Sequence, residues 1–525
     1  MPDPTEKKPV LLIPVRADAG DLADAEKPLP AVLQAASRGV GGGPEPFLAN
    51  VVVEESYTLA AIGRGDAPDT RTIEDDRKLL ALEAGDGTTI FMRSDRLQEE
   101  LARLYPEAVK DGQIDLSRFR DREAASHGLG DWVWQKVSVL RLDRDAIIDL
   151  ALAQAKQRAI EWLGEKAAET IDAELGASAL GAQALMWAIE SQLAGQPRLY
   201  LWHGGELAGS DRCRADDPRL TEAVQAGPLL ILIHGTGSHT LAAFNDLRAS
   251  TDWESLTRQF GERVFGFEHR TFSESPIDNA LSLAHTLPAG ARLSLVTHSR
   301  GGLVGDLLCL GALDDAAIDA YRRVVPVGKD ESEWQRRVRE KVAAEEQRKL
   351  RELRGLLDDK RFQIERYVRV ACPARGTTLL SDNLEVFLSG LLSLTVKLAG
   401  ALTGPAGSAV SSAFKRIVLE IADKRVDPEL VPGIEAMLTD APMGMLLARA
   451  RRGPRVEMAV IAGDIEGGEP AEAHPRHVYR LDVLRQGGQR SGGRYRLHVR
   501  RAGASPGHPL PIRPRRVGPS LDLFR

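Results

Sequence analysis

One short stretch, residues 293–304 (LSLVTHSRGGLV), constrains the fold of this chain more than any other. Its first part is typical of a buried strand, its middle of a tight turn, and its last part of a helix. Ser299 stands at the turn. Gly301 lies two residues after it, and Thr297 lies two residues before it, where glycine is usual. A strand, a sharp turn and a helix in this order lift a serine hydroxyl out of the backbone, where a base can reach it. Taken alone, the stretch also fits an ordinary strand-to-helix turn capped by Ser299.

A second stretch of similar construction lies upstream, at residues 228–238 (PLLILIHGTGS). A fully apolar run leads there into a loop made of His234, Gly235, Thr236 and Gly237. The backbone N–H groups of such a loop can point at the oxyanion that forms when a serine attacks an acyl carbon. We therefore predict that both runs are strands of one parallel sheet and that the Ser299 hydroxyl faces the Gly235–Gly237 loop.

Three later motifs follow in order: VFGFEHRT at residues 264–271, VACPARGT at 370–377 and VIAGD at 460–464. Together with the first two motifs they make residues 198–468 resemble the α/β-hydrolase superfamily. The resemblance is to the lipase-like serine hydrolases that bacteria often encode beside, or fused to, caspase-like CHAT domains. It implies an α/β fold with a mostly parallel sheet flanked by helices, and a serine hydrolase that works through an acyl-enzyme.

The resemblance also implies a role for each motif residue. Ser299 would be the nucleophile, and the backbone N–H of Arg300 would be the first oxyanion donor. Gly235 or Thr236 would supply the second donor. His234 matches the structural histidine of the family, so it would fix the loop rather than act as the base, while Gly301 keeps the turn narrow.

The acid and the base should come after a later strand, in the order serine, acid, histidine. Asp464 at the end of the VIAGD motif is the candidate acid; alternatively it binds a turn or a metal and the acid comes from a later segment. The histidines beyond Asp464 are His474, His477, His498 and His508. None of them occupies the place that the resemblance implies.

The tail, residues 469–525, differs from the rest in composition, because Arg, Gly, Pro and His dominate it. Such tails are usually of low order. Relatives are expected to carry here a segment resembling V-V-D-T-x-S-M-x-G-G, followed by the histidine, and a one-base shift in the codons that could encode residues 478–502 permits such a segment. Our hypothesis is that a frameshift after Asp464 replaced the native end of the chain. The tail should then lack a final packed strand and helix.

The remaining segments suggest accessory parts. Residues 1–142 predict an N-terminal accessory α/β region, and the alanine-rich residues 143–197 predict a helical connector. Residues 329–366 carry many charges of both signs and predict a solvent-exposed helical insertion that could be shortened. Residues 384–425 predict apolar cap helices, with core packing as the alternative; they are too short in uninterrupted apolar sequence for a membrane span.

Composition limits the class of function. The 525-residue chain is long enough for two to four domains. A net charge of −6, with 43% hydrophobic and 27% charged residues, gives no basic excess for nucleic acid. Three scattered cysteines suggest neither disulfides nor a metal site, and the apolar run at residues 10–15 is too short for a signal peptide, so we expect a cytoplasmic protein.

The expected function is therefore a lipase-like or esterase-like hydrolase without a cofactor. The aliphatic cap favours a small-molecule or lipid-like ester with an apolar acyl group as substrate. The alternative is a catalytically dead hydrolase fold that serves as an interaction module, which Thr297 and the missing histidine favour. In either case a protein partner could bind the N-terminal region or the arm at residues 329–366.

Overall fold

The computed structural model describes the chain in part, and most completely between residues 198 and 462. In that span the gaps are 206, 324–332, 378–383, 399–404, 425–430, 450 and 453–455. Elsewhere it describes residues 10–15, 27–34, 48, 50–59, 69–73, 77–85, 87–106, 109–110, 113–116, 134–143, 153, 157, 160–161, 185–187, 189–190 and 482–486.

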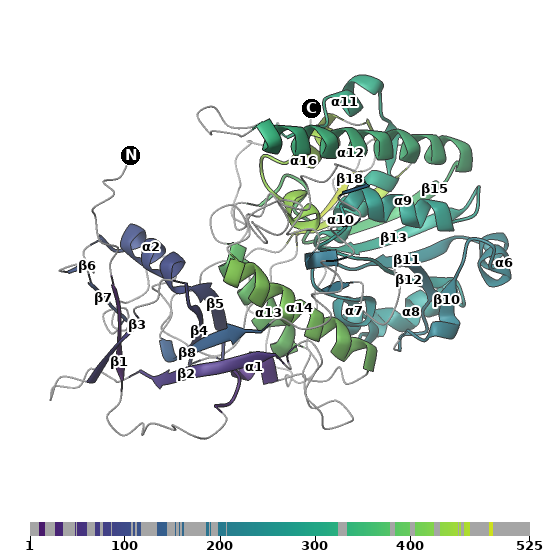
Figure 1. Ribbon diagram of the computed structural model, residues 1–525. Helices are drawn as coiled ribbons and strands as arrows, with labels where there is room; N and C mark the ends of the chain where they lie inside the picture. The colour runs from purple at the N-terminus through teal and green to yellow at the C-terminus, as the bar shows by residue number, and fades with distance from the viewer. Residues whose placement is uncertain are drawn as a thin grey trace, which may run out of the picture.

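An eight-stranded sheet forms the centre of the larger part of the molecule, with the strand order β10-β9-β12-β11-β13-β15-β17-β18 (Figure 1). The five strands from β12 to β17 in this order run parallel, while β10, β9 and β18 pair antiparallel with their neighbours. The strands are β9 (Arg198–Leu201), β10 (Arg212–Cys213), β11 (Leu229–Ile233), β12 (Val264–Glu268), β13 (Arg292–His298), β15 (Gln363–Val370), β17 (Glu457–Ala462) and β18 (Asp482–Gln486).

The central strands are apolar throughout because helices cover both faces of the sheet. In β11, Leu229, Ile231 and Ile233 join the core under α9 and α10, whereas Leu230 and Leu232 pack with residues of α7 and α8 on the other face. The expected α/β class with a mostly parallel sheet is thus observed. The helices around the sheet are α6 (Pro218–Ala226), α7 (Thr240–Arg248), α8 (Thr251–Phe260), α9 (Pro276–Thr286), α10 (Gly301–Leu308), α11 (Asp315–Asp319), α12 (Glu333–Lys360), α15 (Pro432–Glu435) and α16 (Pro442–Arg449).

The prediction that the charged segment at residues 329–366 is a solvent-exposed insertion is wrong. The segment forms the long helix α12, as expected, but the helix lies along α9 and does not project into solvent. Leu350 and Leu353 are fully buried, and the Lys349 ammonium lies 2.8 Å from the Asp278 carboxylate of α9. Leu350 and Leu353 form only a narrow apolar stripe on α12. The many charged residues of the segment therefore concealed this buried face from the sequence analysis. The last residues of the segment belong to β15.

The N-terminal region contains two small sheets, with the orders β3-β1-β7-β6 and β2-β8-β4-β5. The helix α2 (Ser94–Leu104) packs between them through Leu97 and Leu101, in one apolar cluster with Leu80 of β4 and Leu11 of β1. The strands are β1 (Val10–Val15), β2 (Val51–Thr58), β3 (Asp69–Ile73), β4 (Leu79–Ala84), β5 (Thr89–Arg93), β6 (Val109–Lys110), β7 (Gln113–Asp115) and β8 (Trp134–Leu142). We call these sheets with α2 the N-terminal module.

Helices α13 (Leu384–Leu398) and α14 (Pro405–Lys424) lie between the N-terminal module and the eight-stranded sheet (Figure 1). In α13 the hydroxyl oxygens of Ser393 and Ser389 accept the backbone N–H groups of Thr89 and Phe91 in the edge strand β5, at 3.1 and 3.0 Å. The described side chains of α14 from 413 to 422 are all buried. These two helices therefore act as packing between two parts of the molecule.

Two further expectations concern the ends of the large domain. Most of the predicted connector at residues 143–197 lies outside the described residues. In the tail the structure describes β18, which pairs antiparallel with β17, the last of the parallel strands. The prediction of a tail without a final strand is therefore wrong for residues 482–486. Without β18, one side of β17 would present unpaired backbone N–H and C=O groups, and an extended segment of any sequence can pair with such groups. The other residues of the tail are not described.

Candidate functional site

Ser299 sits at the turn between β13 and α10 with a backbone φ of +52°, one of three non-glycine residues in the described chain with positive φ. This conformation is strained for an L-residue with a side chain. It is held from both sides, because the Ser299 N–H donates to the Val370 carbonyl at 2.8 Å and the Ser299 carbonyl accepts the Gly302 N–H at 2.9 Å. The serine is thus presented at the carboxyl end of a central parallel strand.

Two glycines let the Ser299 turn and the 234–237 loop approach each other. A methyl group at Gly235 would lie 2.7 Å from Ser299 Cβ and 3.3 Å from its Oγ. A methyl group at Gly301 would lie 2.4 Å from the His234 carbonyl oxygen. Real Cβ atoms do not make such contacts, so both positions require glycine. The structure therefore brings Ser299 against Gly235, where the sequence predicted a contact, and also brings Gly301 against His234.

Thr297, two residues before Ser299, is accommodated by another glycine. Its side chain is fully buried, and a Cβ at Gly305 in α10 would lie 3.0 Å from the Thr297 methyl carbon. The same Cβ would lie 2.6 Å from the Tyr367 hydroxyl. The volume that Thr297 adds on the strand is thus removed from the facing helix.

Three backbone N–H groups around Ser299 have no acceptor among the described residues. In the described part of the chain, no acceptor is found for the N–H groups of Gly235, Thr236 or Arg300. The next N–H of the loop, that of Gly237, is different, because it donates to the Thr271 hydroxyl at 3.0 Å. The N–H groups of Gly235, Thr236 and Arg300 are the ones that the resemblance names for an oxyanion.

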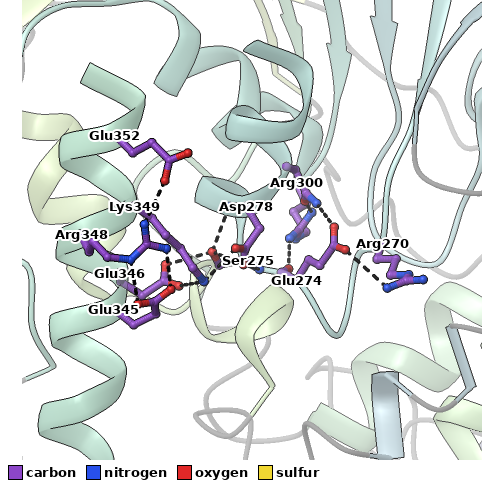
Figure 2. Close-up of polar contacts among 11 residues, drawn as sticks. Arg270, Glu274, Ser275, Asp278, Arg300, Glu345, Glu346, Arg348, Lys349 and Glu352 are labelled. Carbon is purple, nitrogen blue, oxygen red and sulfur yellow. Dashed lines mark hydrogen bonds and ion pairs between the residues drawn. The ribbon is translucent and has the colours of Figure 1, made fainter. Parts of the chain in front are cut away.

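The Arg300 side chain has a role that sequence reasoning missed. The guanidinium is fully buried and donates to the Gly433 carbonyl at 2.9 Å, to Asn279 Oδ1 at 2.8 Å and to the Glu274 carbonyl at 2.5 Å. Figure 2 shows Arg300 and Glu274 side by side at the start of a polar network that continues to α12. Burial lowers the pKa of Arg300 to about 10, and burial raises the pKa of the Glu274 carboxyl to about 7. The sequence shows only an arginine directly after the serine, so it could not predict that the Arg300 side chain is buried and holds these three partners.

Histidines surround the loop but occupy structural positions. His234 is buried, with Nδ1 3.0 Å from the Gly235 carbonyl, and its Nε2 accepts the backbone N–H of His269 at 3.3 Å. The two rings stack with centroids 4.1 Å apart. Burial lowers the pKa of His234 and of His269, which favours the neutral imidazoles that these contacts need. His298 is the last residue of β13, and burial lowers its pKa as well.

The structure does not place the candidate acid or base. Asp464 lies outside the described residues, and so do His474, His477, His498 and His508. Among the histidines that are described, none is hydrogen-bonded to Ser299. His285 instead lies 2.9 Å from Glu352 of α12, far along the helix α9 from its N-terminus.

A buried carboxylate outside every motif also reaches this region. Glu190, in the predicted connector, accepts hydrogen bonds from the backbone N–H groups of Thr271, Phe272 and Ser273. The only sequence signal was a single acid directly after the apolar run at residues 184–189. Such a lone charge is also common at helix surfaces, so the pattern alone could not identify it.

Comparisons with known proteins give little guidance. A family model described as a domain of unknown function (DUF7379) matches residues 207–331, which include the loop at 234–237 and Ser299. No curated protein matches the chain. In the described residues no helix has the length and apolar character needed to cross a membrane, and no group of three or more His, Cys, Asp or Glu side chains could hold a metal ion.

Proposed function

We propose that residues 198–468 have the α/β-hydrolase fold and that the chain is a serine hydrolase of the lipase or esterase type. The observation that carries the proposal is the strained φ of +52° at Ser299, directly against Gly235. A protein maintains strain of this kind only where the surrounding structure enforces it, and it concentrates at functional sites. The strand order β12-β11-β13-β15-β17, with the serine after the central β13, also agrees with the proposal.

In the proposed reaction, Ser299 Oγ attacks the carbonyl carbon of an ester and its proton passes to a histidine base. The carbonyl oxygen becomes an oxyanion that accepts hydrogen bonds from the N–H groups of Arg300 and of Gly235 or Thr236. The tetrahedral intermediate collapses, the alcohol leaves with the proton, and an acyl-enzyme remains. Water then repeats the sequence and releases the acid. The Phe414 ring of α14, which lies against Gly237 of the 234–237 loop, favours an apolar acyl group.

The second candidate is an inactive hydrolase fold that serves as an interaction module. It is favoured by one observation: no histidine of the described chain is hydrogen-bonded to Ser299. A chain whose native end had been replaced by a frameshift after Asp464 would be in this state, and the nucleotide sequence of the gene tests that hypothesis. If no one-base shift restores V-V-D-T and a downstream histidine, the frameshift hypothesis fails.

Labelling by a fluorophosphonate probe decides between the two functions. The hydrolase should be labelled, and Ser299→Ala should abolish the labelling without changing the far-UV circular dichroism. A well-folded wild-type protein that is not labelled would contradict the proposed activity and support the interaction module.

A further inference from the structure

The turn at residues 271–275, which follows β12, contacts both halves of the proposed oxyanion site. On one side the Thr271 hydroxyl accepts the Gly237 N–H at 3.0 Å and so holds the end of the 234–237 loop. On the other side the Glu274 carbonyl accepts a hydrogen bond from the Arg300 guanidinium at 2.5 Å. The 271–275 turn therefore supports both the loop and Arg300, whose backbone N–H groups are the proposed oxyanion donors.

Glu190 holds this turn in place. Its Oε1 accepts the N–H groups of Thr271 at 2.9 Å and Phe272 at 3.1 Å, and its Oε2 accepts the N–H and hydroxyl of Ser273 at 2.8 and 2.5 Å. The Glu190 side chain is 4% exposed. A buried carboxylate is tolerated only when it is fully hydrogen-bonded, and these donors have no other acceptor in the described structure. The carboxylate and the turn therefore stabilise each other.

We propose that Glu190 is a positioning residue for the proposed acyl-transfer site. It fixes the 271–275 turn, and this turn sets the distance between the two oxyanion donors, the N–H group of the 234–237 loop and that of Arg300. Since Glu190 precedes the first strand of the eight-stranded sheet, a segment outside the hydrolase motifs determines the geometry at their centre. This inference rests on the proposed function for its catalytic meaning, whereas the mechanical link from Glu190 to Gly237 does not.

The test uses the full chain with Glu190→Gln, which keeps the side-chain size. The amide presents an NH2 group where the carboxylate presented an acceptor, so part of the turn loses its partner. Glu100→Gln is the matched control, because Glu100 is similarly buried, at 3% exposed, but pairs with Arg96 in α2 of the N-terminal module. Hydrogen exchange followed by mass spectrometry measures the link from Glu190 through the 271–275 turn to the 234–237 loop. The rate constant of fluorophosphonate labelling at saturating probe measures its effect on the reactivity of Ser299.

We expect Glu190→Gln to speed exchange in peptides that cover residues 271–275 and 234–239, and Glu100→Gln to leave both unchanged. The labelling rate constant should fall by on the order of tenfold to a hundredfold, since small misplacements of catalytic donors have effects of that size. The probe concentration at half-maximal rate should stay the same, because the substrate-binding surface is untouched.

A second variant keeps the test informative if Glu190→Gln does not fold. Thr271→Val removes only the acceptor of the Gly237 N–H, so exchange should rise at 234–239 but not at 271–275, with a smaller loss of labelling rate. Unchanged exchange at 234–239 in both variants would overturn the inference. Faster exchange with an undiminished labelling rate would also overturn it, whereas a wild type that is never labelled would overturn the proposed function itself.

Discussion

The backbone of Ser299 carries a cost that should be measurable. A non-glycine residue at positive φ is destabilised, in general by about 1 kcal/mol relative to glycine at the same position. We therefore expect Ser299→Gly to be more stable than Ser299→Ala by about that amount, since both lack the hydroxyl and only glycine relieves the strain. Urea denaturation of the two variants checks this. Equal stabilities would mean that the turn relaxes without its hydroxyl.

The pairing of Thr297 with Gly305 makes a second prediction at this scale. Gly305→Ala should destabilise the fold by about 1–3 kcal/mol, because the added methyl meets the Thr297 methyl carbon and the Tyr367 hydroxyl in a close-packed core. Gly355→Ala is the control: nothing lies within 4 Å of a Cβ at Gly355 in α12, so alanine should stabilise that helix slightly. Thermal unfolding of both proteins measures the contrast. A neutral Gly305→Ala would show that Thr297 needs no compensation.

Glu274 should make stability depend on pH. Burial raises the pKa of its carboxyl from 4.5 to about 7, so the folded protein binds a proton there that the unfolded chain releases between those values. The contribution of Glu274 to stability is therefore adverse above pH 7 and is relieved as the pH falls towards 4.5. Glu274→Gln, which imitates the protonated form, should be more stable than wild type at pH 8 and lose this advantage at pH 5.

Urea denaturation at the two pH values measures the difference, with Glu222→Gln as the control. Glu222 is exposed on α6, so its substitution should change the free energy of unfolding by the same small amount at both pH values. A constant difference between Glu274→Gln and wild type across the range would contradict the assignment of the titration to Glu274.

At the scale of elements, α12 shows how a few apolar residues decide the place of a charged helix. Leu350 and Leu353 are buried against the rest of the protein, and the Lys360 ammonium donates to the carbonyls of Ala284, His285 and Leu287 at the end of α9. Leu353→Ala should therefore cost about 2–5 kcal/mol, as expected for a buried leucine. Arg337→Ala, on an exposed position of the same helix, should cost little. If Leu353→Ala left the thermal midpoint unchanged, α12 would not be packed on the domain and the prediction of a solvent-exposed helix would be correct.

The elements that sequence could predict are those whose own residues determine them. The apolar run before the 234–237 loop and the run before Ser299 each end in a turn that needs glycine, so β11, β13 and their contact follow from local pattern. Contacts that depend on distant partners could not be read in this way. Glu190 meets the 271–275 turn across about 80 positions of sequence, and Thr297 meets Gly305 only once α10 folds back on β13. Asp464 remains a prediction, because no described residue tests it.

At the scale of the whole molecule, α13 and α14 connect the N-terminal module to the eight-stranded sheet. In α14, Lys415 donates at 2.8 Å to the carbonyl of Leu33 in the short N-terminal helix α1 (Ala31–Gln34), while the neighbouring Phe414 ring lies against Gly237 of the site loop. In α13, Ser389 and Ser393 satisfy N–H groups of the edge strand β5. Because the same helices touch both parts, we expect the two parts to unfold in one cooperative transition.

The double variant Ser389→Ala, Ser393→Ala tests this connection. It leaves the N–H groups of Thr89 and Phe91 buried without their acceptors, at a cost of about 1–3 kcal/mol each. The N-terminal module should then unfold at lower urea than the sheet, so that hydrogen exchange in β4 and β5 precedes exchange in β11 and β13. Ser250→Ala, which removes a hydroxyl bonded only within its own turn, should preserve a single transition. Two transitions already present in the wild type would show that α13 and α14 do not couple the parts, and that the N-terminal module folds independently of the site.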